Sequence, residues 1–149
     1  ALTVAQVPKL TTAQVAAMTT DQVANLTVEQ IAAMETADLV SLTDSQFTSL
    51  KTAQIQALTT QQVASLTTSQ VASLTDAQIP VMETRDVRAL TTDQIAALSD
   101  KQVNKLTTAQ FIALSTAQVE AWAAVLNKGP SSLLSGAGRI GCGRLGLGL

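Results

Sequence analysis

The sequence lacks histidine and tyrosine altogether, and it has a single cysteine, Cys142. Without histidine, neither a Ser-His nor a Cys-His nucleophile pair can be assembled. A zinc site would have to be built from carboxylates and one thiolate, which is a poor ligand set for that metal. One cysteine also excludes an internal disulfide framework. We therefore expect neither an enzyme nor a bound cofactor.

Aromatic residues and charge are scarce as well. Phe47, Phe111 and Trp122 are the only aromatic residues, so a core must be built from Leu, Val, Ile, Met and Ala. The net charge is −2 over 149 residues. This composition argues against nucleic-acid binding, which needs a basic stripe and stacking rings. No apolar run approaches the ~20 residues of a membrane span, so we expect a soluble protein.

Glycine is missing from most of the chain, because all seven glycines lie at or beyond position 129. This change in composition divides the chain into a repeat region over 1–128 and a Gly-rich tail over 129–149. We interpret the tail as a flexible linker; the alternative is that "GRLGLGL" adds an edge strand or docks on a partner. There is no initiator Met and no signal-peptide pattern, so we expect a processed or excised segment.

What the sequence does contain is an eight-residue repeat, seen in "LTTAQVAAM" over 10–18. Leu, Met or Trp occupies every eighth position from Leu2 to Trp122, a series that we call the Leu row. A second apolar residue follows five places later, from Val7 to Val119, and forms the Val row. Fifteen units can be counted in this way. Internal repetition of this kind predicts a solenoid.

Each unit has the pattern of a helix start. Thr11 can accept a hydrogen bond from the backbone N–H of Gln14, whose side chain can reach back to the N–H of Thr11, and this is a capping box. Leu10 against Val15 completes a hydrophobic staple. Wherever the cap residue is Thr or Ser, in twelve units, its partner is Gln. We therefore predict structural caps throughout, for example at Thr11 with Gln14, Thr59 with Gln62, and Thr91 with Gln94.

One long helix does not fit this period. Eight residues advance the chain by about 800°, roughly 80° beyond two turns, so the Leu row would wind round the helix. Pro8 and Pro80 would interrupt such a helix, and the strict alternation of a β-solenoid is missing. We predict an all-α, compact superhelical solenoid of very short helices, one per eight-residue repeat. No helix before Ser115 should exceed about eight residues.

The two ends of the array differ. The segment "STAQVEAWAAVLNKGP" predicts a longer capping helix over about 115–128, which Gly129 and Pro130 end. The N-terminus has no equivalent, so an apolar layer containing Leu2 and Val7 would face solvent. We therefore predict self-association through this N-terminal face, or stacking on other repeats of a longer array.

Two units carry acidic residues at the cap and partner positions, namely Glu35 with Asp38 and Glu83 with Asp86. The pairs lie six units apart, so a superhelical turn that divides six units evenly would align them, and their oxygens could hold Ca²⁺. The simpler interpretation is an acidic version of the cap, which the positive helix end favours. These four residues are therefore weak metal candidates.

The repeat region, over residues 2 to about 122, resembles the Leu-Thr-Thr-x-Gln-Val/Ile octapeptide arrays of large secreted or surface proteins of Gram-negative bacteria. The likeness rests on "LTTAQVAAM", "LTTQQVASL" and "LTTDQIAAL". The resemblance implies a secreted or cell-surface location and a structural or adhesive role. Some of those proteins carry haem-utilisation labels, but this chain has no His or Tyr to serve as an axial ligand.

Two classes of function follow from these observations. The first is a non-catalytic structural repeat module: a spacer, an adhesin segment, or a building block of a filament or stalk. The alternative is a binding scaffold for a protein, a glycan, a Ca ion or ice, which would use the solvent-facing repeat positions. A spacer should tolerate substitution of Gln56, Arg88 and Asn104, whereas a binder should not.

Overall fold

The computed structural model of the chain describes residues 2–128, and within that range the regular elements are helical and no strand occurs. One short element follows another, with one in each octad, and before α13 none is longer than six residues. The elements are η1 (Val7–Lys9), α1 (Thr12–Ala16), α2 (Thr20–Ala24), α3 (Val28–Ala33), α4 (Thr36–Ser41), α5 (Asp44–Thr48), α6 (Thr52–Gln56), α7 (Thr60–Ser65), α8 (Thr68–Ser73), η2 (Ile79–Val81), α9 (Thr84–Ala89), α10 (Thr92–Ala96), α11 (Asp100–Val103), α12 (Thr108–Ala113) and α13 (Thr116–Lys128). The predicted all-α solenoid of very short helices is confirmed. The Gly-rich tail, and with it the linker interpretation, lies outside the described residues.

Each short helix begins directly after its cap residue, and its C-cap lies at, or one or two residues before, a residue of the Leu row. Before α7, Thr59 is extended (φ −85°, ψ 159°), and its Oγ1 accepts from the backbone N–H of Gln62 at 3.2 Å. The Gln62 Oε1 accepts in turn from the Thr59 N–H at 2.9 Å. Leu66 is again extended (φ −58°, ψ 147°), which ends the helix. The chain therefore changes direction at every Leu-Thr step.

Three units lack a hydroxyl at the cap, and in none of them does the cap side chain accept a hydrogen bond from the backbone of its own helix start. The N–H of the third helical residue bonds instead to the cap carbonyl; the pairs are Asp38 to Glu35 at 3.1 Å, Gln54 to Lys51 at 2.9 Å, and Asp86 to Glu83 at 2.9 Å. The interpretation of the two Glu–Asp pairs as acidic caps is therefore wrong. The side chains of both Glu residues remain exposed and do not turn back to the helix start.

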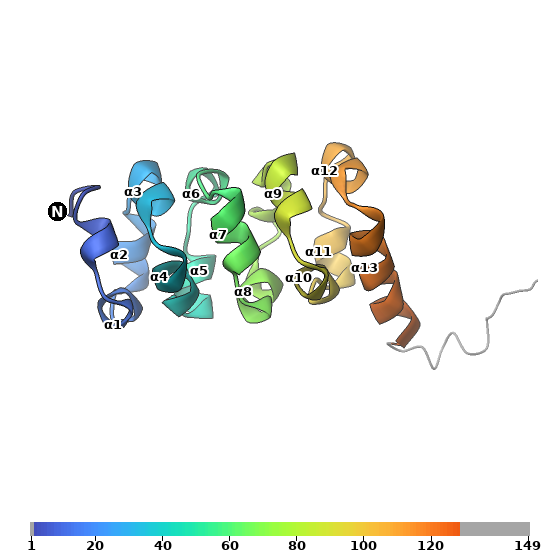
Figure 1. Cartoon of the computed structure of the whole chain (residues 1–149), viewed down its shortest axis with the longest axis horizontal. Coiled ribbons are helices and arrows are strands. Elements are labelled where there is room, and N and C mark those ends of the chain that lie inside the picture. The colour runs from blue at the N-terminus through green and yellow to red at the C-terminus, as the bar shows by residue number, and fades with distance from the viewer. Residues whose placement is uncertain (1, 129–149) are drawn as a thin grey trace, which may run out of the picture.

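Helices three units apart in the sequence pack side by side. They form three strings, which run α1–α4–α7–α9–α12, α2–α5–α8–α10–α13 and η1–α3–α6–η2. The result is an elongated superhelix with the N-terminus at one end and α13 at the other (Figure 1). None of the helices in residues 2–128 has both the length and the apolar character that a membrane crossing requires.

The two apolar rows make one continuous core. The Val row is almost fully buried from Val7 to Ile95, with exposed fractions of 2 % or less. The Leu row is buried from Met34 to Leu98 and half-buried toward both ends. Full burial of such a side chain is worth roughly 1.5–3 kcal/mol. Stacking therefore supplies the stability that helices of five or six residues cannot supply alone.

Candidate functional site

The Gln side chain of each interior unit is buried although it is polar. Gln62 has an exposed fraction of 2 %. Its Oε1 completes the capping box, while its Nε2 donates to the backbone carbonyls of Ile31 at 2.8 Å and Met34 at 2.9 Å. These two carbonyls lie at the C-terminal end of α3, where helix carbonyls lack intrahelical partners. One side chain thus satisfies the start of its own helix and the end of a helix four units earlier.

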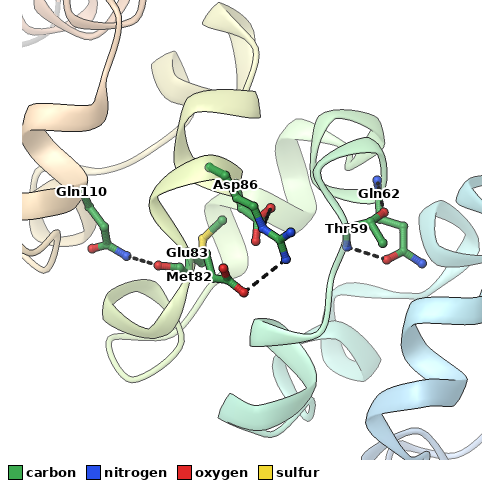
Figure 2. Close-up of polar contacts among 7 residues, drawn as sticks. Thr59, Gln62, Met82, Glu83, Asp86 and Gln110 are labelled. Carbon is green, nitrogen blue, oxygen red and sulfur yellow. Dashed lines mark hydrogen bonds and ion pairs between the residues drawn. The ribbon is translucent and has the colours of Figure 1, made fainter.

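The same contact recurs along the superhelix, and we call the series the glutamine ladder. Figure 2 shows Gln110, whose Nε2 reaches the Met82 carbonyl at 2.7 Å. A ladder side chain bonds to a unit four earlier, while its helix packs against one three units earlier. One superhelical turn therefore takes between three and four units. The rungs that bond to both a Val-row and a Leu-row carbonyl are Gln46, Gln54, Gln62, Gln70, Gln78, Gln94, Gln102, Gln110 and Gln118.

The ladder is the feature that sequence reasoning missed. The cap pairs of Thr11, Thr59 and Thr91 all form both hydrogen bonds of the box, but the box uses only half of each amide. A capping box accepts Glu as readily as Gln, and the helix dipole favours an acid in the first turn. No unit has Glu at this position. The avoidance of Glu was the signal that a hydrogen-bond donor is required there.

Asp86 occupies a ladder position without being able to act as a rung. Its exposed fraction is 1 %, and neither carboxylate oxygen has a hydrogen-bond partner. By the repeat register, a Gln at this position would donate to the carbonyls of Ile55 and Leu58. The equivalent carbonyls in other turns accept hydrogen bonds from a ladder Gln. Arg85 lies close by, with its Nε 3.7 Å from the Asp86 Oδ1 and its terminal nitrogen 3.2 Å from the Glu83 Oε1.

The environment of the two buried aspartates favours their protonated forms. Burial raises the pKa of Asp86 to about 6; Arg85 opposes this rise, and the nearby Glu83 adds to it. Burial also raises the pKa of Asp38 above its ordinary value, and Glu35 contributes in the same direction. A carboxylate has no donor to offer to backbone carbonyls, whereas a protonated carboxyl has one. Asp86, with a pKa of about 6, therefore interrupts the ladder at neutral pH, and the Asp38 side chain makes no ladder bond within residues 2–128 either.

The two acidic pairs lie on the same string of helices but do not meet. They begin α4 and α9, and α7 packs between these helices. Thr59 and Gln62 of the α7 cap therefore stand between the pairs. Within residues 2–128, no group of three or more acidic, thiol or imidazole side chains is placed to share a metal ion. Although the two Glu–Asp pairs lie on one string of helices, their four carboxylates do not form a single site.

The N-terminal end differs from its prediction in one respect. Val7 has an exposed fraction of only 1 %, because η1 packs against α3, so it belongs to the core and is not available to a partner. Leu2 is 37 % exposed and lines a cavity of about 500 Å³. The other lining residues are Leu10, Gln14, Met18, Asp21, Gln22, Asn25, Leu26, Thr27 and Gln30. We call this feature the N-terminal groove.

Gln56, Arg88 and Asn104, which were expected to face solvent, are exposed. The residue after each Val-row position is exposed at Gln56, Arg88, Asn104 and Glu120. Thr residues such as Thr12, Thr20 and Thr52 are the first residues of their helices and are also exposed. The surface between the rungs is thus free to vary without disturbing the core or the ladder.

Comparison with known proteins identifies the repeat. The family model described as the ALTTAQ repeat matches residues 1–28, 31–76 and 79–116. No curated protein and no solved structure matches the chain.

Proposed function

The chain belongs to the ALTTAQ repeat family, and from this premise we propose that it is a non-catalytic structural module of a secreted or cell-surface protein. Its role in this proposal is that of a spacer or stalk segment that sets a distance. The likeness of its octads to those of secreted and surface arrays supports the location. The observation that carries the structural role is the glutamine ladder.

The ladder favours extension because its acceptors are backbone carbonyls. Gln94, for example, bonds to the carbonyls of Val63 and Leu66 at 2.9 and 2.7 Å, and any residue type could supply those oxygens. A unit that has the Gln can therefore stack on any unit four places earlier. An array can grow by one octad at a time without a new set of complementary side chains. Length then increases in proportion to the number of units.

The expected test is the dimension of the particle in solution. Inserting one to four copies of "LTTQQVAS" (58–65) after Ser65 should lengthen the particle by a constant increment per octad at an unchanged cross-section, as measured by small-angle X-ray scattering. A matched control carries Glu in place of the ladder Gln in every inserted octad, which keeps the cap acceptor but removes the donor. A particle that becomes rounder or gains no length with added octads would contradict the spacer role.

A binding scaffold is the second candidate function, and the variable exposed positions favour it. Its test is the combined substitution Gln56→Ala, Arg88→Ala and Asn104→Ala, which leaves core and ladder untouched. For a spacer we expect unchanged length, stability and attachment of the intact parent protein at the cell surface. Loss of adhesion with unchanged length would assign the function to a binding surface instead.

A further inference from the structure

Three ladder positions at the N-terminal end, Gln6, Gln14 and Gln22, have no acceptor for their Nε2 groups among residues 2–128, and two of them, Gln14 and Gln22, line the N-terminal groove. The Oε1 atoms of Gln14 and Gln22 are held by the backbone N–H groups of Thr11 and Thr19, at 2.9 and 2.8 Å. Both Gln side chains are exposed, and their Nε2 groups have no hydrogen-bond partner among residues 2–128. The capping bonds therefore hold two amide donors in the orientation of the interior rungs, beside the N-terminal groove.

The groove also exposes part of the apolar core. Leu10, Met18 and Leu26 belong to the Leu row and line it, and they are half-buried. Their interior equivalents from Leu42 to Leu98 are buried. The groove thus offers apolar side chains and two amide donors. In the interior of the superhelix, the same groups are covered by the end of a neighbouring octad helix.

The opposite end of the superhelix presents the complementary groups. Phe111 and Val119 belong to the Val row but are 46 % and 36 % exposed, because no described helix packs over them. The carbonyls of Leu106 and Leu114 occupy the acceptor register of the ladder and receive no amide from residues 2–128. This C-terminal edge therefore offers acceptors eight residues apart, the spacing of the two free donors.

We propose that the N-terminal groove of one chain docks on the C-terminal edge of a second copy, continuing the glutamine ladder from molecule to molecule. The inference rests on the proposed structural role and names its partner as the chain itself. In the interior register, Gln14 would donate to the carbonyls of Val103 and Leu106, and Gln22 to those of Phe111 and Leu114. The first helix of the second copy would cover Phe111 as interior helices cover the Val row.

The long helix α13 sets where this contact begins. α13 packs on α10 and continues as one helix to Lys128, through the stretch of sequence where a regular array would begin its next octad. In the proposed contact, the irregular 3-10 turn η1 of the second copy lies next to the end of α13 of the first copy. The first pair of helices that pack as interior helices do is therefore α1 of the second copy with α12 of the first. The contact joins two different surfaces, so it leaves both outer ends open and allows chains of molecules to form.

The test is sedimentation of the full chain over a range of concentrations. Gln14→Glu with Gln22→Glu keeps both cap acceptors but replaces the donors with carboxylates that repel carbonyl oxygens. We expect the wild type to associate with rising concentration and this N-terminal variant to associate roughly tenfold or more weakly, since both amide donors and the hydrogen bonds that they make to four carbonyls are lost. The charge-matched control, Gln56→Glu with Gln61→Glu, changes exposed residues away from both ends and should associate like the wild type.

A mixing experiment distinguishes head-to-tail docking from symmetric pairing. Phe111→Glu should disable the C-terminal edge, and Val119→Glu replaces it if circular dichroism shows that Phe111→Glu does not fold. Each single-end variant should remain monomeric alone, whereas an equimolar mixture of the two should form dimers, because each partner retains one intact end. Dimers of the C-terminal variant alone would show N-to-N pairing and overturn the proposal.

A wild-type chain that stays monomeric up to its solubility limit would also overturn docking between copies. It would leave the particle-length result of the octad insertions unaffected, so the two proposals can fail separately. Unchanged association of the Gln14→Glu, Gln22→Glu variant would show that the free amides take no part.

Discussion

Replacing Asp86 with Gln should stabilise the protein, and the gain should be larger at neutral than at acidic pH. Asp86 is buried, its two oxygens have no hydrogen-bond partner, and it stands at a ladder position where other units have Gln. The substitution removes a buried charge and supplies the amide that the carbonyls of Ile55 and Leu58 lack. It restores Gln, the residue whose side-chain amide bonds to the backbone carbonyls in the neighbouring turns.

The magnitude follows from the pKa of Asp86, which burial raises from 3.8 to about 6. A raised pKa of an acid means that the folded state holds its proton more tightly than the unfolded state does. The cost of the charge is therefore absent below pH 3.8, grows as the pH rises toward 6, and stays constant above that value. About two pKa units correspond to about 3 kcal/mol. The new hydrogen bonds add roughly 0.5–1.5 kcal/mol each at any pH.

The assay is urea unfolding followed by circular dichroism across the range from acidic to slightly alkaline pH. Above pH 6 the Asp86→Gln variant should exceed the wild type by about 4–6 kcal/mol, and near pH 4 by roughly 1–3 kcal/mol. Asp86→Asn is the matched control, because it removes the charge but is one methylene too short to act as a rung. It should abolish the pH dependence and recover only part of the stability. Equal stabilisation by Gln at both ends of the pH range would refute the charge argument.

Three other changes test the remaining parts of the structure. Gln62→Ala removes half of a capping box and a ladder rung, so we expect a loss of about 2–4 kcal/mol in urea unfolding, comparable with the ~2–5 kcal/mol expected for the cavity left by Leu66→Ala. Gln62→Glu keeps the cap acceptor but loses the rung and buries a carboxylate, so its loss should be larger at neutral than at acidic pH. A loss for Gln62→Ala as small as that of an exposed Gln56→Ala would argue against a ladder. Lys51→Thr supplies the missing cap acceptor for α6 and should raise stability by about 0.5–2 kcal/mol, whereas the same change at the exposed Lys9, which is not at a cap position, should have no effect. Haemin titration of a Cys142→Ala variant should give no sharp, saturable Soret shift, and such a shift would contradict a cofactor-free module.

The sequence predicted the local structure well because the signals for it are local. The Thr and Gln of a capping box lie three residues apart, and Leu10 and Val15 lie within one unit, so the helix starts could be read from a single octad. The superhelical turn could not, because it depends on contacts 28 and 31 residues apart, such as those of Gln62 with Met34 and Ile31. Nothing within one octad states which carbonyl lies opposite a given amide.

The same separation of scales explains why the acidic units were misinterpreted. Within one octad, Glu83 and Asp86 form a chemically reasonable cap, and the helix dipole favours acids there. The neighbouring turn decides otherwise, because it buries the Asp86 side chain against carbonyls that need a donor. Val7 was misplaced for a related reason, since its exposure depended on whether α3 packs over η1. In both cases the missing information was which segment of the chain packs against the residue in the next superhelical turn.

The interruptions at Asp38 and Asp86 also locate the weakest contacts of the array. In a solenoid each unit contacts mainly its neighbours, so the loss of a rung is felt locally and is not shared over the whole core. At neutral pH, α9 is held by its apolar rows without a ladder bond from Asp86, whereas α8 and α10 are held by both. Because local opening follows the weakest set of contacts, backbone amides around α9 should exchange with solvent before those of α8 and α10. Acidification removes the cost of burying the Asp86 charge, and the difference between α9 and its neighbours should then shrink.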